Sequence, residues 1–259
     1  MGRSLASSKY CIGGDCHPVP RHDRCGKEAV KVTIFYFTLK RSFGSLTNLI
    51  FLTLAPIACI FFPAGEAWPA LPYGYQYFGI IILFVAIRLT QIIIEDRARG
   101  VIKRLSVAPI RYFHYLSQNL FAYFVILILQ CAIVIVGGLL RGQELYQPFA
   151  LFTLYLSFSF TALAIALAWI SIFRNKDIAF LVYMSLIFLM VLMGGIMMPL
   201  EMFPDLMKRI AVILPTFWFA EGLNWVVYGR QTSNFMLING VLWLYTLVFL
   251  VLGSTRKMQ

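Results

Sequence analysis

Long apolar runs separated by short polar segments dominate the pattern of this chain. Six runs of more than 20 residues contain no Asp, Glu, Lys or Arg: 42–65, 67–87, 112–140, 145–173, 178–200 and 231–255. About 20 apolar residues in a helix cross the hydrocarbon core of a bilayer, and a helix satisfies its own backbone hydrogen bonds in lipid. The pattern therefore predicts an all-α polytopic membrane protein.

Each of the six runs is predicted to hold one transmembrane helix. The predicted spans are about 45–62, 74–94, 114–139, 149–172, 178–198 and 234–253. A further apolar run, 210–220, has 11 residues and is too short to cross a membrane. Because prolines interrupt the chain on both sides of this run, we predict an external re-entrant helical hairpin between spans five and six.

The composition excludes other classes of protein. Hydrophobic residues make up 60% of the chain and charged residues only 13%, whereas about a quarter of a soluble domain is charged. Disorder of the whole chain needs low hydrophobicity, and a transmembrane β-barrel would show short alternating segments. Neither pattern fits these long unbroken runs.

The basic residues predict the orientation in the membrane. Of the 22 Lys and Arg residues, 17 fall on the side that holds both termini, and Arg88 lies inside the second span. The other side has four, which are Arg141, Lys208, Arg209 and Arg230. By the positive-inside rule, both termini of this inner (plasma) membrane protein are cytoplasmic. The net charge of +11 is dispersed over four segments, so no nucleic-acid partner is predicted.

Residues 1–27 are predicted to form a disordered cytoplasmic tail, followed by one membrane domain over 28–259. The tail contains several potential metal ligands, namely Cys11, Cys16, His17, His22 and Cys25. Their spacing does not match the paired-Cys pattern of structural zinc sites, and thiols stay reduced in the cytosol. Metal binding by the tail is therefore the less favoured interpretation, and no metal site is predicted.

The polar segment after span two, residues 95–110, predicts a short amphipathic cytoplasmic helix. Glu95 and Asp96 open it, and Val101, Leu105 and Ala108 recur at helical spacing before Pro109. Two interpretations remain open. The segment is either a basic loop held by anionic lipid or a docking element for a cytoplasmic partner.

A second unusual segment, residues 193–229, follows the fifth span. Gly194 and Gly195 allow close helix packing, and prolines then break the chain three times, at Pro199, Pro204 and Pro215. Glu221 follows within an apolar stretch, where an ionisable group is a functional candidate. The alternative interpretation is an ordinary proline-rich external loop.

Together these two segments resemble the permease subunit of type-2 ATP-binding-cassette (ABC) exporters, the group that includes drug and natural-product efflux permeases. The family pattern after span two corresponds to Glu95, Arg99, Gly100, Leu105 and Pro109. Its pattern after span five corresponds to Gly194, Gly195, Pro199, Pro204, Pro215 and Glu221. The resemblance covers about residues 30–259, and the N-terminal extension is longer and richer in Cys than is usual for the family.

The resemblance implies a mechanism. The loop after span two would be a coupling helix docked on a separate cytoplasmic ATPase, and residues 28–42 an interfacial helix. Two permeases, as a homodimer, would work with two ATPases, and the glycine- and proline-rich segment would shape the outer gate. ATP and Mg would bind to the ATPase, so this chain is expected to bind no cofactor of its own, and its other partners are membrane lipids.

The chain lacks the motifs of the competing enzyme class. Its Gly26-Lys27 pair is not part of the phosphate-binding pattern GxxxxGK[ST], and neither HExxH nor GxSxG occurs. No catalytic residue is therefore predicted, and the chain is expected to be a transporter subunit. A secondary transporter without an ATPase and a membrane scaffold remain as other classes.

Arg88 and the substrate leave further alternatives. The side chain of Arg88 either extends to the cytoplasmic surface or faces the substrate path or another subunit. For the substrate, the resemblance favours an amphipathic or lipid-linked compound such as a drug, antibiotic, peptide or glycolipid. Export of a polysaccharide or glycoconjugate is the alternative.

Overall fold

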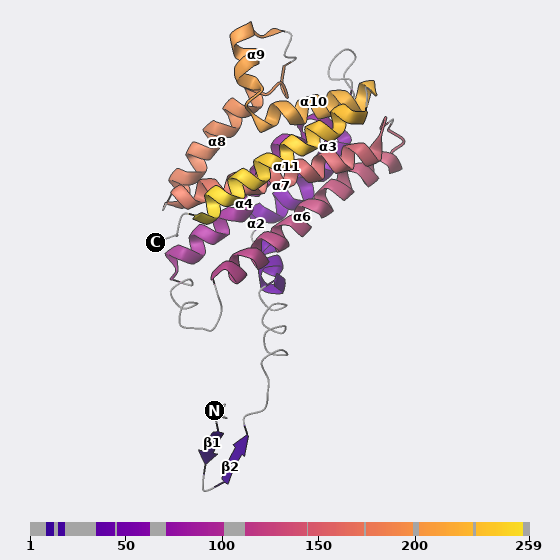
Figure 1. Cartoon of the computed structure of the whole chain (residues 1–259). Coiled ribbons are helices and arrows are strands. Elements are labelled where there is room, and N and C mark those ends of the chain that lie inside the picture. The colour runs from indigo at the N-terminus through magenta and orange to yellow at the C-terminus, as the bar shows by residue number, and fades with distance from the viewer. Residues whose placement is uncertain are drawn as a thin grey trace, which may run out of the picture.

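The computed structural model describes residues 9–12, 15–18, 35–44, 46–62, 71–100, 112–143, 145–173, 175–198, 202–229 and 232–255. Long helices packed side by side form the body of the molecule (Figure 1). The long helices are α4 (Tyr73–Ala98), α6 (Tyr112–Leu140), α7 (Pro148–Ile172), α8 (Lys176–Met193) and α11 (Thr232–Thr255). The all-α polytopic fold predicted from the sequence is confirmed.

Five described helices are long and apolar enough to cross a membrane, and they coincide with predicted spans two to six. They run over Tyr73–Asp96, Tyr115–Leu140, Pro148–Ile172, Lys176–Met193 and Ser233–Gly253. Only 28% of the α8 window and 17% of the α11 window are buried inside the protein. These two helices therefore present much of their apolar surface outward, as expected for contact with lipid or with another membrane-embedded chain.

The first predicted span, 45–62, is the one that differs. It forms three joined pieces, α2 (Leu46–Leu49), the π-helical turn η1 (Ile50–Leu54) and α3 (Ala55–Phe61). Its continuous apolar part, Ile50–Phe61, is shorter than a membrane-crossing helix. Polar residues occupy its first turn, and Pro56 interrupts its backbone hydrogen bonds. That this helix crosses the membrane stays a prediction.

Gln130 compensates for the missing amide of Pro56. Proline has no N–H, so the carbonyl groups four and five residues before it lose their helical donor. The side-chain amide of Gln130 on α6 donates to both, at 3.0 Å to the Leu52 oxygen and 3.2 Å to the Phe51 oxygen. A buried side chain from another helix therefore stabilises the irregular turn.

Helix α7 is the central element of the core. It packs against α4, α6, α10 and α11, and 72% of its apolar window is buried. Hydroxyl groups link it to α11, since Thr161 donates to the Leu242 carbonyl at 3.0 Å and Ser157 to the Asn239 side chain at 2.8 Å. Small side chains on α7 allow this close approach, as is usual for helix pairs in membranes.

Between α8 and α11 the chain forms the expected bent pair of helices. Helix α9 (Asp205–Ala211) and α10 (Pro215–Tyr228) meet at an angle of 95°. Figure 1 shows both beyond the end of α8, at the opposite end of the bundle from the C-terminus. Pro215 occupies the first turn of α10, where its missing N–H costs nothing. This geometry agrees with a re-entrant or broken element.

The N-terminal region contains a short hairpin that the sequence did not predict. Strands β1 (Lys9–Ile12) and β2 (Asp15–Pro18) pair antiparallel, with Cys11 opposite Cys16. These eight residues therefore differ from the predicted disorder, and the rest of the 1–27 tail lies outside the described residues. Of the predicted interfacial helix 28–42, residues 35–42 are helical, and the helix continues to residue 43. Residues 28–34 also lie outside the described residues.

Candidate functional site

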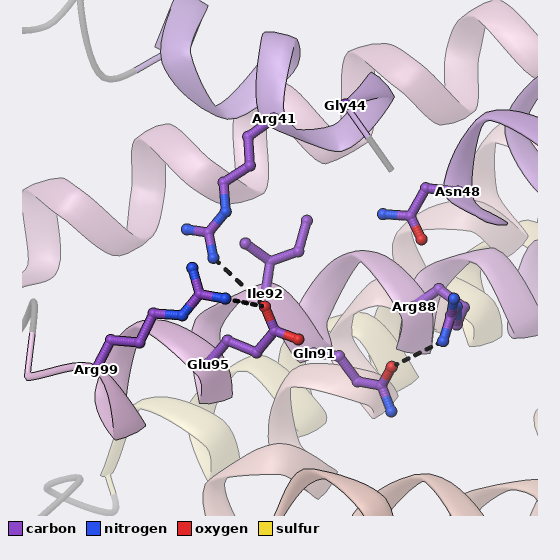
Figure 2. A pocket seen from close by; sticks show the side chains of 8 residues that line it. All are labelled: Arg41, Gly44, Asn48, Arg88, Gln91, Ile92, Glu95 and Arg99. Atoms are coloured by element: carbon purple, nitrogen blue, oxygen red, sulfur yellow. Dashed lines mark hydrogen bonds and ion pairs between the residues drawn. The ribbon is translucent and has the colours of Figure 1, made fainter. Parts of the chain in front are cut away.

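Charged side chains from three segments converge at the C-terminal end of α4. The Glu95 carboxylate contacts three cations, with Lys176 Nζ at 3.0 Å, Arg41 at 3.5 Å and Arg99 at 3.8 Å. Figure 2 shows the guanidinium groups of Arg41 and Arg99 side by side, both directed at the Glu95 carboxylate. We call Arg41, Glu95, Asp96, Arg99 and Lys176 the ionic end. It joins helix 35–43, α4 and the start of α8.

A buried layer lies beneath these contacts. Asp96, only 5% exposed, forms an ion pair with Arg41 and accepts a hydrogen bond from the Tyr115 hydroxyl of α6. Burial lowers the pKa of Arg41, but the hydrogen bond and charge of Asp96 outweigh it and raise that pKa above its ordinary value. Arg41 therefore stays charged and fastens helix 35–43 to α4.

A second contact joins helix 35–43 directly to α6. The Thr38 hydroxyl donates to the Asn119 side chain at 2.6 Å, and the Asn119 amide donates to the Tyr115 carbonyl at 2.9 Å. Both side chains are buried. Helix 35–43 is thus connected to the two helices, α4 and α6, that flank the predicted coupling loop.

A cavity of about 350 Å³ opens beside the ionic end. Side chains that line it include Arg41, Asn48, Arg88, Gln91, Glu95 and Arg99 (Figure 2). Arg88 thus lies in the wall of this cavity, where its guanidinium group approaches the Gln91 amide oxygen at 3.5 Å and the Phe180 ring at 5.7 Å. Its predicted place on the substrate path stays a prediction.

Only some of the residues predicted for coupling are among the residues that the structure describes. Glu95 and Arg99 lie in the ionic end, and Gly100 follows with φ of +70°, a conformation that side chains with a Cβ rarely adopt. Leu105 and Pro109 lie outside the described residues. Gly100 therefore sets the direction in which the chain leaves α4.

The predicted outer-gate residues lie at the opposite end of the bundle. Gly194 ends α8 and packs against Thr216. The Thr216 hydroxyl donates to the Met190 carbonyl at 2.6 Å. A methyl group on Gly194 would overlap the Thr216 side chain, so glycine permits this contact between α8 and α10.

The remaining gate residues lie on the segments between α8 and the middle of α10. Gly195 has φ of +80°, and Pro204 immediately precedes α9. Pro215 is buried at the start of α10, and Glu221 is partly exposed on the same helix. Pro199 lies outside the described residues. The gate role of this set stays a prediction.

Several residues of the ionic end carried no individual signal in the sequence. Arg41 and Lys176 entered only the count of basic residues, and Tyr115 lies 19 positions from its partner Asp96. Arg41 could have been identified from its position directly before the first charge-free run. That position places it at the same predicted membrane boundary as Glu95 and Asp96. In the part of the chain that the structure describes, no group of three or more His, Cys, Asp or Glu side chains could hold a metal ion.

Comparison with known proteins bears on this arrangement. Residues 70–255 match the family described as "ABC-2 family transporter protein". The chain is also similar to a Bacillus subtilis (strain 168) protein named "Putative transport permease YvfS", with 25% identity over 230 residues. That similarity covers 81% of this chain and 91% of the relative. The family match spans most of the chain, including α4, the loop after it and the α9–α10 pair, and so the chain belongs to the ABC-2 family of transporter membrane proteins.

Proposed function

We propose that this chain is the permease subunit of an ATP-driven exporter that moves an amphipathic or lipid-linked compound out of the cytoplasm or inner leaflet. Two copies would work with two copies of a separate ABC ATPase. The membership in the ABC-2 family supports a transmembrane permease that associates with such an ATPase. Export, the substrate class and the homodimer are our proposal.

The observation that supports coupling most directly is the ionic end at the base of the loop 101–111. Glu95 and Asp96 connect the end of α4 to helix 35–43 and α8, and Tyr115 adds α6. A displacement of the loop by a docked ATPase would therefore pull on several helices at once. We assign the loop after α4 as the coupling element on this basis.

The same end is proposed to be cytoplasmic. It contains Arg41, Arg99 and Lys176 among the described residues, and the flanking sequence adds Lys103, Arg104 and Arg111. Basic residues in short loops are retained on the cytoplasmic side. The α9–α10 pair and its glycine contacts would then lie toward the outer side, consistent with a gate at the exit.

Co-purification with a candidate ATPase tests this function. The complex mass and the vanadate-sensitive ATP hydrolysis are measured for the unaltered chain, Gly100→Pro and Gly142→Pro. Gly142 also has positive φ, at +69°, but lies in the turn after α6 at the other end of the bundle. A two-plus-two complex whose hydrolysis falls only with Gly100→Pro would support coupling through this loop. A chain that retains no ATPase from its own genome would favour a secondary transporter.

A charge exchange gives a second, sharper test. Exchanging Glu95 and Arg99 by Glu95→Arg with Arg99→Glu restores their mutual attraction but places the new arginine beside Arg41 and Lys176. Because the Glu95 carboxylate pairs with three cations, we expect the exchanged protein to lose ATP-driven export. Unchanged export in the exchanged protein, measured in inside-out vesicles with a candidate amphipathic substrate, would contradict the coupling assignment.

A further inference from the structure

The cavity beside the ionic end carries more positive charge than its carboxylate can neutralise. Three arginines and one glutamate line it, Arg41, Arg88, Arg99 and Glu95. Glu95 is already shared among Arg41, Arg99 and Lys176. Arg88 has no carboxylate within ion-pair distance among the described residues. An anion that entered this cavity would therefore meet an uncompensated guanidinium group.

The hydrogen bonds of these arginines are also incomplete. Arg88 Nε is buried without a hydrogen-bond partner in the described part of the protein, and one terminal nitrogen of Arg41 has only its long ion-pair contact with Glu95, at 3.5 Å. The contact of Arg88 with Gln91, at 3.5 Å, is at the limit of a hydrogen bond. Buried charged donors without acceptors are costly, so such groups call for an acceptor that the chain itself does not supply.

The position of the cavity indicates which hydrogen-bond acceptor can reach these arginines. Arg88 lies seven residues before Glu95, roughly 10 Å along the helix at 1.5 Å per residue, and so close to the membrane boundary. Beside Asn48, which lines the cavity, α2 exposes Leu46 and Leu49. Polar groups that face inward next to apolar groups that face outward match a lipid, with its headgroup in the cavity and its acyl chains along α2.

We infer that this cavity binds the phosphate of an anionic membrane phospholipid, with Arg88 as its main ligand. Arginine forms paired, charge-assisted hydrogen bonds with phosphate oxygens. The volume of about 350 Å³ falls at the lower end of small-molecule pockets, as suits a headgroup whose acyl chains remain outside. The bound phosphate would accept hydrogen bonds from Arg88 and Arg41 and would connect α4 to helix 35–43.

Titration of the purified full-length chain in mild detergent with dioleoyl phosphatidylglycerol tests the inference. Bound lipid is counted by native mass spectrometry, and the melting temperature is recorded in parallel. Arg88→Gln is expected to weaken binding about tenfold, the effect of losing one hydrogen bond between charged groups. Lys40→Gln is the matched control, because it removes the same charge from an exposed position on helix 35–43 that does not line the cavity.

The outcomes separate the possible sources of phosphate. Saturable binding that falls with Arg88→Gln but not with Lys40→Gln supports the inference. Equal loss in both variants would mean general attraction to anionic lipid and would overturn it, as would unchanged binding in Arg88→Gln. If 10 mM inorganic phosphate displaces the lipid completely, the site takes the free ion and the lipid assignment is wrong.

A second variant covers the case in which Arg88→Gln does not fold. Arg99 lines the same cavity but its side chain is 69% exposed, so Arg99→Gln is expected to fold and to weaken lipid binding several-fold. No ATPase or transport substrate takes part in these measurements. Their failure would therefore leave the proposed permease function untouched, and failure of ATPase coupling would leave the lipid site untouched.

Discussion

The two ends of the helix bundle are held together by different kinds of contact. At the ionic end, long charged side chains reach across a cavity, and the Glu95 side chain remains 31% exposed. At the other end, Gly74 of α4 lies directly against the Cys59 backbone of α3, and the Tyr75 hydroxyl contacts Gly138 of α6. We call Cys59, Ile60, Gly74, Tyr75 and Gly138 the glycine-packed end.

The arginines show the same difference. Arg41 pairs with two carboxylates. Arg141, beside the glycine-packed end, donates instead to the Ile60 carbonyl at 3.1 Å and lies over the Phe61 ring at 4.2 Å. Flexible ion pairs tolerate small displacements of the helices that hold them, whereas backbone contacts without side chains do not. The comparison teaches that the ionic end is built to allow small relative displacements of its helices, as the proposed coupling role requires, whereas the opposite end is a more rigid junction.

The largest expected effect breaks the glycine-packed end. In Gly74→Ala the added methyl group would overlap the Cys59 carbonyl, which is backbone and cannot rotate away. We expect a loss of about 3 kcal/mol in stability, typical of severe overpacking. The melting temperature of the detergent-solubilised protein measures it. Gly240→Ala on α11 is the control, because open space surrounds that glycine, and alanine there should be neutral or slightly stabilising. Equal melting temperatures for both variants would disprove the close contact.

The next effect concerns the buried layer of the ionic end. Asp96→Asn removes the charge that neutralises Arg41 and is expected to cost about 2 kcal/mol, less than a fully buried pair because Arg41 is partly exposed. Asp205→Asn serves as the control, since that carboxylate is 96% exposed in its contact with Lys208 and its loss should leave the melting temperature unchanged. Similar melting temperatures for the two variants would mean that the Arg41–Asp96 pair contributes little to stability.

A smaller effect is expected at the irregular first helix, which lies between the two ends. Gln130→Leu removes the side-chain donor to the Phe51 and Leu52 carbonyls and should cost about 1 kcal/mol. Adding Pro56→Ala supplies a backbone N–H and should recover most of that loss. A double variant less stable than Gln130→Leu alone would show that Gln130 does not replace the missing amide of Pro56.

The sequence predicted the features that depend on local composition. The length of an uninterrupted apolar run decides whether a helix can cross the bilayer, so spans two to six could be placed to within a few residues. Pro215 likewise placed the break between α9 and α10, and Pro204 the start of α9. The first predicted span, 45–62, coincides with the joined helix 46–61. Its irregular backbone could not be predicted, because it depends on contacts of polar side chains such as Asn48, which is buried against the protein.

The contacts that build the candidate site could not be predicted in the same way. Arg41 and Asp96 are 55 positions apart, and Lys176 and Glu95 are 81 apart. Which charges meet depends on the order in which the helices pack, and no local pattern encodes that order. Glu95 could be singled out because it ends a span, but basic residues occur in four segments on the same predicted side of the membrane, and the sequence does not show which of them it meets. The pairing of Gln130 with the carbonyls before Pro56 is non-local for the same reason.

The smallest effect on stability is expected at the exposed rim of the ionic end, and it separates folding from coupling. Arg99 is 69% exposed and lies 3.8 Å from Glu95, so Arg99→Gln should change stability by about 0.5 kcal/mol or less. Its melting temperature should also respond less to added salt, because an exposed ion pair has been removed. If this residue couples the loop to α4, ATP hydrolysis by the assembled complex should fall although the melting temperature does not. If Arg99→Gln lowers the melting temperature together with ATP hydrolysis, Arg99 has a structural role. The contacts of the ionic end would then be as important for stability as those of the glycine-packed end.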